Sequence, residues 1–189
     1  MIYFVRHGQT NWNLEHKTQG WTDISLNENG KIEAKKVSNI FKNIKIDKIY
    51  SSDLSRAKET AEIINQNYNL DIIIDERLRE IKYGDLEGLR ISKLDQNTWN
   101  IINNNPKKLN AEGYDEVYNR IVDFFKQINK NENILIVTHA GIIRILLYFV
   151  KNNIFNKEEF DKNYRHLKIQ NVAIYRWNIE DNKIDVISR

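Results

Sequence analysis

The sequence predicts an α/β fold, a three-layer α/β/α sandwich with a mostly parallel central sheet. Residues 3–8 and 134–141 each begin as an apolar strand and end in a short run that contains a histidine and a glycine. Elsewhere, strand-like runs alternate with helical patterns, which is typical of a sheet covered by helices on both faces. With 189 residues, 41% of them apolar, the chain can bury one sizeable core, so residues 1–189 are predicted to form a single domain.

The elements of the first half follow from the spacing of apolar residues. A helix is predicted over residues 28–42, and short strands over residues 46–51 and 70–74. Asp53 can cap a second helix that begins near Leu54, because an aspartate side chain accepts hydrogen bonds from the free N–H groups of a first turn. The predicted inner face of the first helix consists of Ile32, Val37, Ile40 and Phe41.

The second half contains a loop, an ambiguous segment and four further elements. Residues 77–88 have the glycine and charge content of a loop. Residues 89–110 are ambiguous between helix and loop, although Pro106 would end any helix there. The remaining predicted elements are helices over residues 115–128 and 142–150 and a hairpin of strands at residues 172–178 and 183–187.

The charge and the cysteine content exclude several classes of protein. The net charge of +3, from 29 Lys and Arg against 26 Asp and Glu, is too small for a nucleic-acid-binding surface. Cysteine is absent, which excludes disulfides, thiolate metal sites and cysteine nucleophiles. The chain opens with a strand rather than a signal peptide, and its longest apolar run, residues 142–150, is too short to span a bilayer. We therefore expect a cytoplasmic protein that binds neither nucleic acid nor membranes.

Arg6, His7 and Gly8 mark the end of the first strand as a candidate anion site. In α/β sheets, ligands bind beyond the carboxyl ends of the strands. Arg6 would supply a fixed positive charge there, and His7 an imidazole that can attack phosphorus to give a covalent phosphohistidine. A strand-end histidine is about as often a polar boundary residue, so this motif alone does not decide the function.

A further arginine and a loop rich in carboxylates extend the candidate site. Arg56 falls in the first turn of the second helix, where its planar fork could point over the sheet edge and match a phosphate. Viewed alone, it would more often be an ordinary surface residue. Glu80, Asp85 and Glu87 lie in the predicted loop of residues 77–88, here called the acidic loop. One of them could protonate a departing alkoxide, although loop carboxylates are usually solvated.

Five segments carry a family resemblance: residues 6–8 with Asn13, residues 19–23 with Leu26 and Gly30, residues 51–57, residues 78–80 with Tyr83, Gly84, Glu87 and Gly88, and residues 138–141. On these segments the chain resembles the histidine phosphatase superfamily, which includes the cofactor-dependent phosphoglycerate mutases and many small phosphatases. The resemblance covers nearly the whole chain. An Arg-His-Gly run is weak by itself, whereas five elements in the family's order are specific.

The resemblance implies a role for each matching residue. His7 would be the phosphorylated nucleophile, and Glu80 the general acid that later activates water. Arg6, Arg56 and His139 would bind the phosphoryl oxygens, His139 as a cation if protonated, beside the free N–H groups of the following helix. No metal and no other cofactor is implied. The other phosphate- or substrate-binding residues would be Asn13, Gln19, Gly20, Tyr83, Thr138 and Gly141.

Several other residues have plainer interpretations. Trp12 and Trp21 could line a substrate pocket, but an aromatic side chain near a loop more often serves packing. His16 and His166 show no motif and are interpreted as surface residues, although Arg165 or His166 could lie at the pocket rim. Asn171 would open the penultimate strand in a structural role.

Three functions stay open, and hydrolysis of a small phosphorylated metabolite is favoured. Mutases of the family carry a longer insertion with adjacent arginines, whereas residues 89–113 are short and contain Arg90 but no arginine pair. The acidic loop is most similar to that of α-ribazole phosphatases and related small phosphatases. The alternatives are mutase-type phosphoryl transfer and, disfavoured by the intact motif residues, a non-catalytic module that binds a phospho-ligand. A homodimer is possible.

Overall fold

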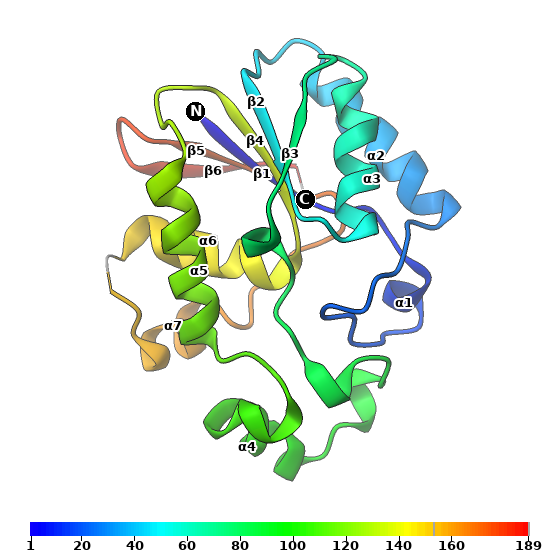
Figure 1. The fold of residues 1–189 in the computed structure, drawn as a ribbon, viewed down its shortest axis with the longest axis vertical. Helices are drawn as coiled ribbons and strands as arrows, with labels where there is room; N and C mark the ends of the chain where they lie inside the picture. The colour runs from blue at the N-terminus through cyan, green and yellow to red at the C-terminus, as the bar shows by residue number, and fades with distance from the viewer. Residues whose placement is uncertain (153, 189) are drawn as a thin grey trace.

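The sheet at the centre of the molecule consists of β1 (Ile2–Arg6), β2 (Lys48–Ser51), β3 (Ile72–Ile74), β4 (Ile134–Thr138), β5 (Ile174–Asn178) and β6 (Lys183–Ser188). The computed structural model describes residues 1–152 and 154–188. The strand order is β3-β2-β4-β1-β5-β6. β4 pairs in parallel with β1 and β2, and β2 with β3, whereas β5 is antiparallel to β1 and β6. Helices cover both faces (Figure 1), so the predicted sandwich is confirmed.

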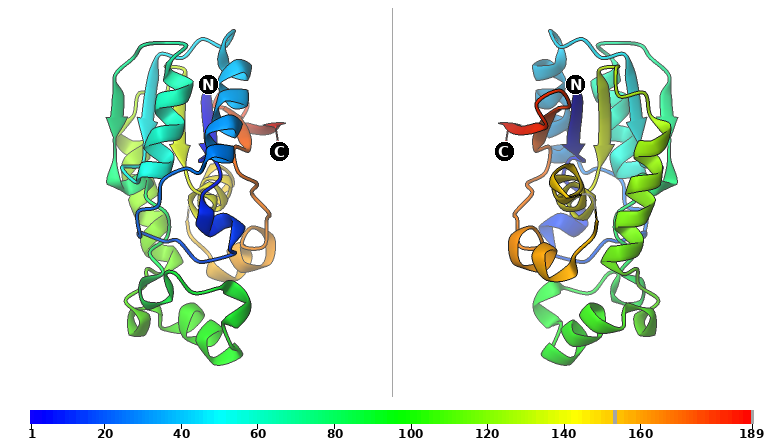
Figure 2. Two further views of the ribbon diagram at one scale, coloured as in Figure 1. Left: turned by 90° about the vertical axis from the view of Figure 1, so that its right-hand side faces the viewer. Right: turned by 90° about the vertical axis from the view of Figure 1, so that its left-hand side faces the viewer.

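The helices are α1 (Asn11–Leu14), α2 (Glu28–Phe41), α3 (Ser55–Asn65), α4 (Gln96–Asn104), α5 (Tyr114–Gln127), α6 (Ala140–Lys151) and α7 (Lys157–Asn163), with short 3-10 turns at Glu76–Leu78, Gly84–Leu86, Ile91–Lys93 and Pro106–Leu109. The ambiguous segment therefore contains a helix, and it ends before Pro106 as expected. Figure 2 shows α4 and its neighbours at one end of the molecule, beyond the sheet. In the described part of the chain, no helix is long and apolar enough to cross a membrane.

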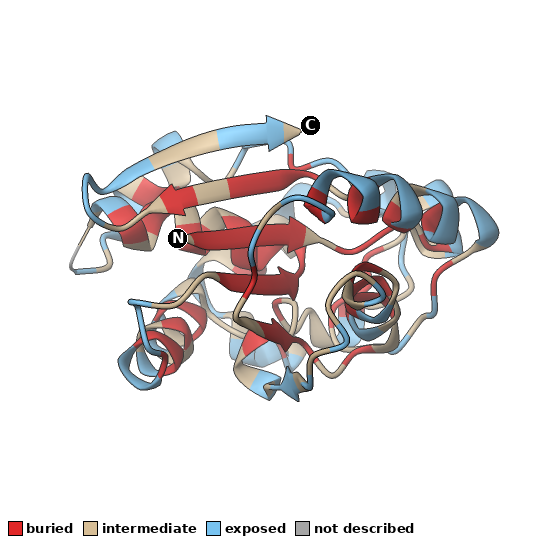
Figure 3. Cartoon of the chain, turned by 90° about the horizontal axis from the view of Figure 1, so that it is seen from above, coloured by how far each residue is buried: buried red, intermediate tan, exposed pale blue. Residues whose placement is uncertain are grey.

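Side chains alternate between the two faces of the sheet, and each face has its own apolar core. On β1, Phe4 packs in the core that α5 and α6 cover, whereas Val5 packs in the core that α2 and α3 cover. Figure 3 shows that buried residues fill the inner strands, while the outer sides of the helices and the edge strand β6 are exposed. Two buried faces explain why β1 and β4 appear in the sequence as unbroken apolar runs.

The predicted inner face of α2 was half wrong. Val37 and Phe41 are buried, but Ile32 and Ile40 are 52% and 41% exposed. The side chain that completes the buried stripe is Ala34, which is 0% exposed. The helix packs tightly through small residues, so the largest apolar side chains were a misleading guide to its inner face.

The predicted N-cap of α3 was also wrong. The N-cap residue is Leu54, and Asp53 instead forms two hydrogen bonds of 2.8 and 3.0 Å with Arg79 Nε. The cap comes from Asp23, whose carboxylate accepts from Ser55 N and Ser55 Oγ, both at 2.7 Å. A residue 32 positions away therefore satisfies the helix terminus, which the local sequence could not reveal.

Candidate active site

The two histidines at strand ends meet because their strands are neighbours. β1 and β4 pair in parallel with Arg6 opposite Thr138, so both chains leave the sheet at the same edge. The rings of His7 and His139 lie with their centroids 5.2 Å apart. Two motifs more than 130 residues apart in the sequence therefore form one site.

His7 is held with one ring nitrogen free. The side chain is 2% exposed, and Nδ1 lies 2.7 Å from the carbonyl oxygen of Gly8. A carbonyl oxygen only accepts, so Nδ1 carries the proton and Nε2 keeps its lone pair. Burial, followed by the charges of Arg6 and Arg56, lowers the pKa of His7 well below its ordinary value of 6.5. His7 is therefore a neutral imidazole near pH 7, as a nucleophile must be.

Arg56 connects His139 to the loop before α2. The arginine is 0% exposed and donates to Gly20 O at 2.7 Å and to His139 Nδ1 at 3.3 Å. A guanidinium only donates, so Nδ1 of His139 accepts and its proton is on Nε2. Burial, then the charge of Arg56, lowers the pKa of His139 well below 6.5. The ring is thus a neutral donor near pH 7, not the imidazolium that the sequence allowed.

Two buried N–H donors close to His7 have no hydrogen-bond acceptor among the described residues. Nε of Arg6 and Nε2 of His139 are both buried without a hydrogen-bond partner among the described residues. Arg6 is anchored through Nη1, which donates to Ile169 O at 2.7 Å. Burial lowers its pKa to about 10, so it stays charged at neutral pH. Buried donors are rarely left unsatisfied, and an anionic oxygen between these residues would accept from both.

Glu80 occupies the amino end of α6. Its Oε1 accepts from Ile81 N at 2.9 Å and from Gly141 N at 3.1 Å. A Cβ on Gly141 would lie 2.3 Å from Glu80 Oε1, so any larger residue there would displace the carboxylate. A cavity of about 740 Å³ opens beside His7. Of the three acidic-loop candidates, Glu80 lines this cavity, whereas Asp85 and Glu87 do not. Glu87 instead accepts from the backbone N–H groups of the loop, including Tyr83 N at 3.1 Å.

Thr138 and Gly141 differ from the prediction that they bind phosphate or substrate. The Gly141 N–H donates to Glu80, and the Thr138 hydroxyl donates to Leu78 O at 2.7 Å. Neither residue lines the cavity. Both fix the acidic loop against β4 and α6, because their hydrogen-bonding groups are already used within the protein.

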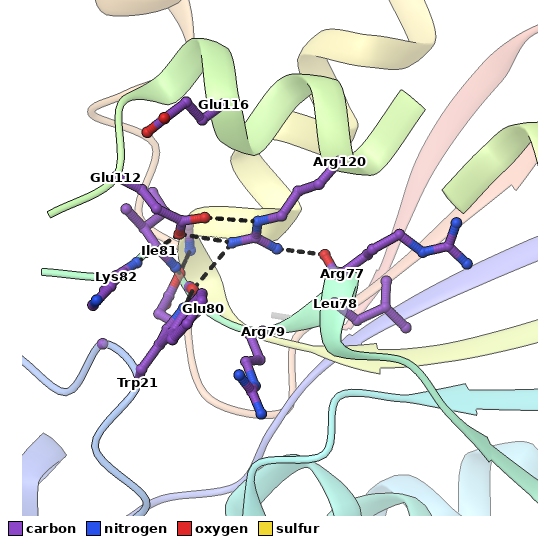
Figure 4. Close-up of polar contacts among 12 residues, drawn as sticks. Trp21, Arg77, Leu78, Arg79, Glu80, Ile81, Lys82, Glu112, Glu116 and Arg120 are labelled. Atoms are coloured by element: carbon purple, nitrogen blue, oxygen red, sulfur yellow. Dashed lines mark hydrogen bonds and ion pairs between the residues drawn. The ribbon is translucent and has the colours of Figure 1, made fainter. Parts of the chain in front are cut away.

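Arg120 holds the main chain of the acidic loop from α5 (Figure 4). Its Nη2 donates to Glu80 O at 3.1 Å, Nη1 donates to Arg77 O, and Nε bonds Glu112 at 3.1 Å. Trp21 Nε1 donates to the same Glu80 carbonyl at 2.8 Å and does not line the cavity. No sequence signal indicated the contact of Arg120, since this residue belongs to an otherwise ordinary amphipathic helix.

Amide side chains contribute neutral donors. Oδ1 of Asn13 accepts from Thr10 N at 3.0 Å and from Asn171 Nδ2 at 3.2 Å, and Oε1 of Gln19 accepts from Thr10 Oγ1 at 3.0 Å. With their oxygens used inside the protein, the two NH2 groups remain available to a ligand. The predicted residues Asn13, Gln19, Gly20 and Tyr83 all line the cavity.

The cavity has a volume of about 740 Å³ and two contrasting ends. Its phosphoryl end is the part lined by Arg6, His7, Arg56 and Glu80. His139 is buried beside His7, at 5.2 Å between ring centroids, and is not part of the lining. Positive charge dominates the lining, which holds six Lys and Arg side chains and the carboxylate of Glu80. His16 and His166 also line it as exposed residues. The distal wall is apolar and consists of Trp12, Leu86, Ile91, Leu94, Trp99 and Ile102.

The described residues include no cluster of three or more His, Cys, Asp or Glu side chains that could hold a metal ion. At the phosphoryl end, the groups available to an anion are guanidinium, imidazole and amide N–H donors, and the carboxyl group of Glu80 is a candidate proton donor and acceptor. Such a set can bind a phosphoryl group, attack it with an imidazole and move a proton at a leaving oxygen.

Comparison with known proteins agrees with this geometry. Residues 2–188 match the family model of the histidine phosphatase superfamily (branch 1). The chain is 38% identical over 157 residues to phosphoglycerate mutase-like protein 4 of Arabidopsis thaliana, covering 77% of this chain and 68% of the relative. It is 38% identical over 149 residues to the uncharacterised phosphatase PhoE of Bacillus subtilis, covering 77% and 75%.

Solved structures show the same fold. The chain superposes on Bacillus stearothermophilus YhfR with a TM-score of 0.79 at 27% identity, covering 99% of this chain and 95% of that one. It superposes on a mutant of phosphoserine phosphatase from Entamoeba histolytica, in complex with phosphoserine, with a TM-score of 0.78 at 26% identity, covering 99% and 94%. The protein belongs to branch 1 of the histidine phosphatase superfamily.

Proposed function

We propose that the protein is a phosphomonoesterase that hydrolyses a small phosphorylated metabolite through a covalent phosphohistidine on His7. The observation that carries the proposal is the state of His7, a buried neutral ring whose Nδ1–H is bound to Gly8 O and whose Nε2 has a free lone pair. Arg6 and Arg56 bring two positive charges to the same end of the cavity. Preorganised charge of this kind stabilises a transferring phosphoryl group.

In the first step, Nε2 of His7 attacks phosphorus, and the bond from phosphorus to the ester oxygen breaks. Glu80, protonated at this stage, gives its proton to the departing alkoxide. The N–H groups of Arg6, Arg56 and His139 donate to the phosphoryl oxygens. Since the proton of His7 stays on Nδ1, where it is donated to Gly8 O, the products are an alcohol and a phosphohistidine.

In the second step, water attacks the phosphohistidine. The Glu80 carboxylate accepts a proton from the water as its oxygen bonds to phosphorus, and the Nε2–phosphorus bond breaks. Inorganic phosphate leaves, and His7 and Glu80 return to their starting protonation states. The backbone N–H groups of Ile81 and Gly141 keep the carboxylate in place throughout.

The distal segment favours hydrolysis over mutase-type transfer. From residues 89–113, the side chains that line the cavity are neutral: Ile91, Leu94, Gln96, Trp99, Ile102 and Asn103. Mutases of the family carry adjacent arginines in a longer insertion at this place, whereas this segment supplies no cation to the cavity. Similarity to a protein called phosphoserine phosphatase and to one called phosphatase PhoE supports the same choice.

A comparison of two reactions tests the proposal. We expect steady phosphate release from p-nitrophenyl phosphate, with an acid-labile phosphoenzyme trapped by rapid quenching. With 3-phosphoglycerate and catalytic 2,3-bisphosphoglycerate, we expect phosphate release rather than isomer exchange. Fast exchange with little release would establish the mutase alternative, and no turnover together with no phosphoenzyme would establish a phospho-ligand binding module.

A further inference from the structure

We propose that the substrate carries a second anionic group, a carboxylate or a second phosphate, which Arg144 and Arg165 bind in the same cavity as His7. The proposal rests on the proposed phosphomonoesterase function and narrows its substrate class. The two arginines come from α6 and from the segment after α7, so this subsite is separate from the segment of residues 89–113.

The first argument is a surplus of positive charge. A phosphomonoester dianion is balanced by Arg6 and Arg56 at the phosphoryl end, yet the lining also contains Lys17, Arg144, Arg165 and Lys168. Lys17 is paired with Glu15 at 2.6 Å, and Arg165 with Asp161 at 3.3 Å. Arg144 and Lys168 form no ion pair with any described residue. An unpaired guanidinium group in a cavity wall, such as that of Arg144, is suited to an anion from outside the chain.

The second argument is the placement of Arg144. Its Nε donates to Leu167 O at 2.8 Å, which anchors the guanidinium, while neither Nη has an acceptor among the described residues. Arg144 lies in the second turn of α6, whose first turn holds the Glu80 carboxylate. Its charge also contributes to the lowered pKa of Arg6, as expected of neighbouring cations. Arg144 therefore lies one helical turn from the residue that binds the Glu80 carboxylate at the phosphoryl end.

The third argument is the set of donors around Arg165. Its guanidinium lies 5.3 Å from the ring centroid of Tyr114, and its side chain is only 15% exposed. Tyr83 and Tyr114 both line the cavity, and their hydroxyl groups have no hydrogen-bond partner within residues 1–152 and 154–188. Two guanidinium groups and two phenolic hydroxyls can thus surround one planar or tetrahedral anion.

Matched substrates test the subsite. 3-Phosphoglycerate and glycerol 1-phosphate differ in whether a carboxylate or a neutral hydroxymethyl group stands at the far end. We expect kcat/KM for the carboxylate to exceed that for the neutral ester by about 10- to 100-fold, the value of one hydrogen bond to a charged group. Glycerol 1,3-bisphosphate in a parallel assay distinguishes a phosphate from a carboxylate as the preferred second anion.

The variants Arg144→Met and Arg165→Met should each reduce this preference about 10-fold or more. The preference is a ratio of two kcat/KM values, so a general loss of activity cancels. Lys151→Met, which removes a positive charge from the exposed end of the same helix, is the control and should retain the preference. Equal kcat/KM for charged and neutral substrates in the unaltered protein, or an unchanged ratio in both arginine variants, would overturn the proposal. Absence of p-nitrophenyl phosphate turnover would instead overturn the proposed function.

Discussion

The phosphoryl end and the distal wall of the cavity are built in opposite ways. At the phosphoryl end, His7, Arg56 and His139 are at most 2% exposed, and backbone carbonyl groups or neighbouring rings fix their orientation. In the distal wall, Ile91 is 51% exposed, and the wall as a whole is apolar. The difference is that hydrogen bonds hold the candidate catalytic groups in fixed orientations, whereas the distal wall offers a ligand few directional contacts.

The largest expected effect tests the nucleophile. His7→Ala should abolish the acid-labile phosphoenzyme and reduce turnover of p-nitrophenyl phosphate to the background rate, because the lone pair of the other ring, His139, already accepts from Arg56. Quench-flow trapping with a 32P-labelled substrate measures the intermediate. His16→Ala, at an exposed histidine of the same cavity, is the control. Turnover that persisted in His7→Ala would contradict the covalent route.

The next effect tests the acid. Glu80→Gln should slow the hydrolysis of esters with poor leaving groups by ~10²- to 10⁴-fold while largely sparing p-nitrophenyl phosphate, because a good leaving group needs no proton. The measurement is kcat against leaving-group pKa, with Asp85→Asn as the control because Asp85 is exposed and outside the lining. Parallel losses with both kinds of ester would show that Glu80 has another role.

A smaller effect tests the hydrogen bond by which Arg120 holds the main chain of Glu80. Arg120→Met removes the donor to Glu80 O and leaves Glu112, whose side chain is 13% exposed, without its partner. We expect a loss of about 3 kcal/mol in the free energy of unfolding, as for other broken buried pairs. We also expect a decrease of about 10-fold in kcat for poor leaving groups, because the acid loses alignment. Urea unfolding measures the loss of stability, and the same leaving-group series measures the decrease in kcat.

Arg120→Lys keeps the charge and should restore part of both losses. If Arg120→Met weakened the fold but affected all esters equally, Arg120 would stabilise the domain without positioning the acid.

The pH dependence of stability tests the buried rings. Burial lowers the pKa values of His7 and His139 well below 6.5, so below that pH the unfolded chain binds protons that the folded chain does not. Their stabilisation is complete above pH 6.5 and is lost as the pH falls. Each ring should contribute a slope of up to about 1.4 kcal/mol per pH unit. Urea unfolding between pH 7.5 and 5 measures the slope, which His7→Gln should reduce.

The smallest effect concerns the distal wall. Trp99→Ala removes a half-buried apolar side chain from α4 and should raise KM for esters with an apolar body about 3- to 10-fold. The value of kcat should change less than twofold, because α4 supplies none of the residues that line the phosphoryl end. A large decrease in kcat would mean that the distal wall also affects the chemical step, so that the two ends of the cavity do not act separately.

The sequence by itself determined the strands and the chemistry that they carry. Unbroken apolar runs marked β1 and β4 because both faces of the sheet are buried, and the residues that follow them included His7 and His139. Glu80 could be separated from Asp85 and Glu87 only by the family pattern, because all three are loop carboxylates in the local sequence.

Only the tertiary structure decided which hydrogen-bonding groups remain free for a ligand. Thr138 and Gly141 belong to a matching motif, yet Leu78 O and the Glu80 carboxylate use their donors. Arg120 has no motif, yet it reaches the acidic loop from another element. The physical reason is that a hydrogen bond depends on the distance between two atoms, and the fold sets that distance between residues far apart in the chain.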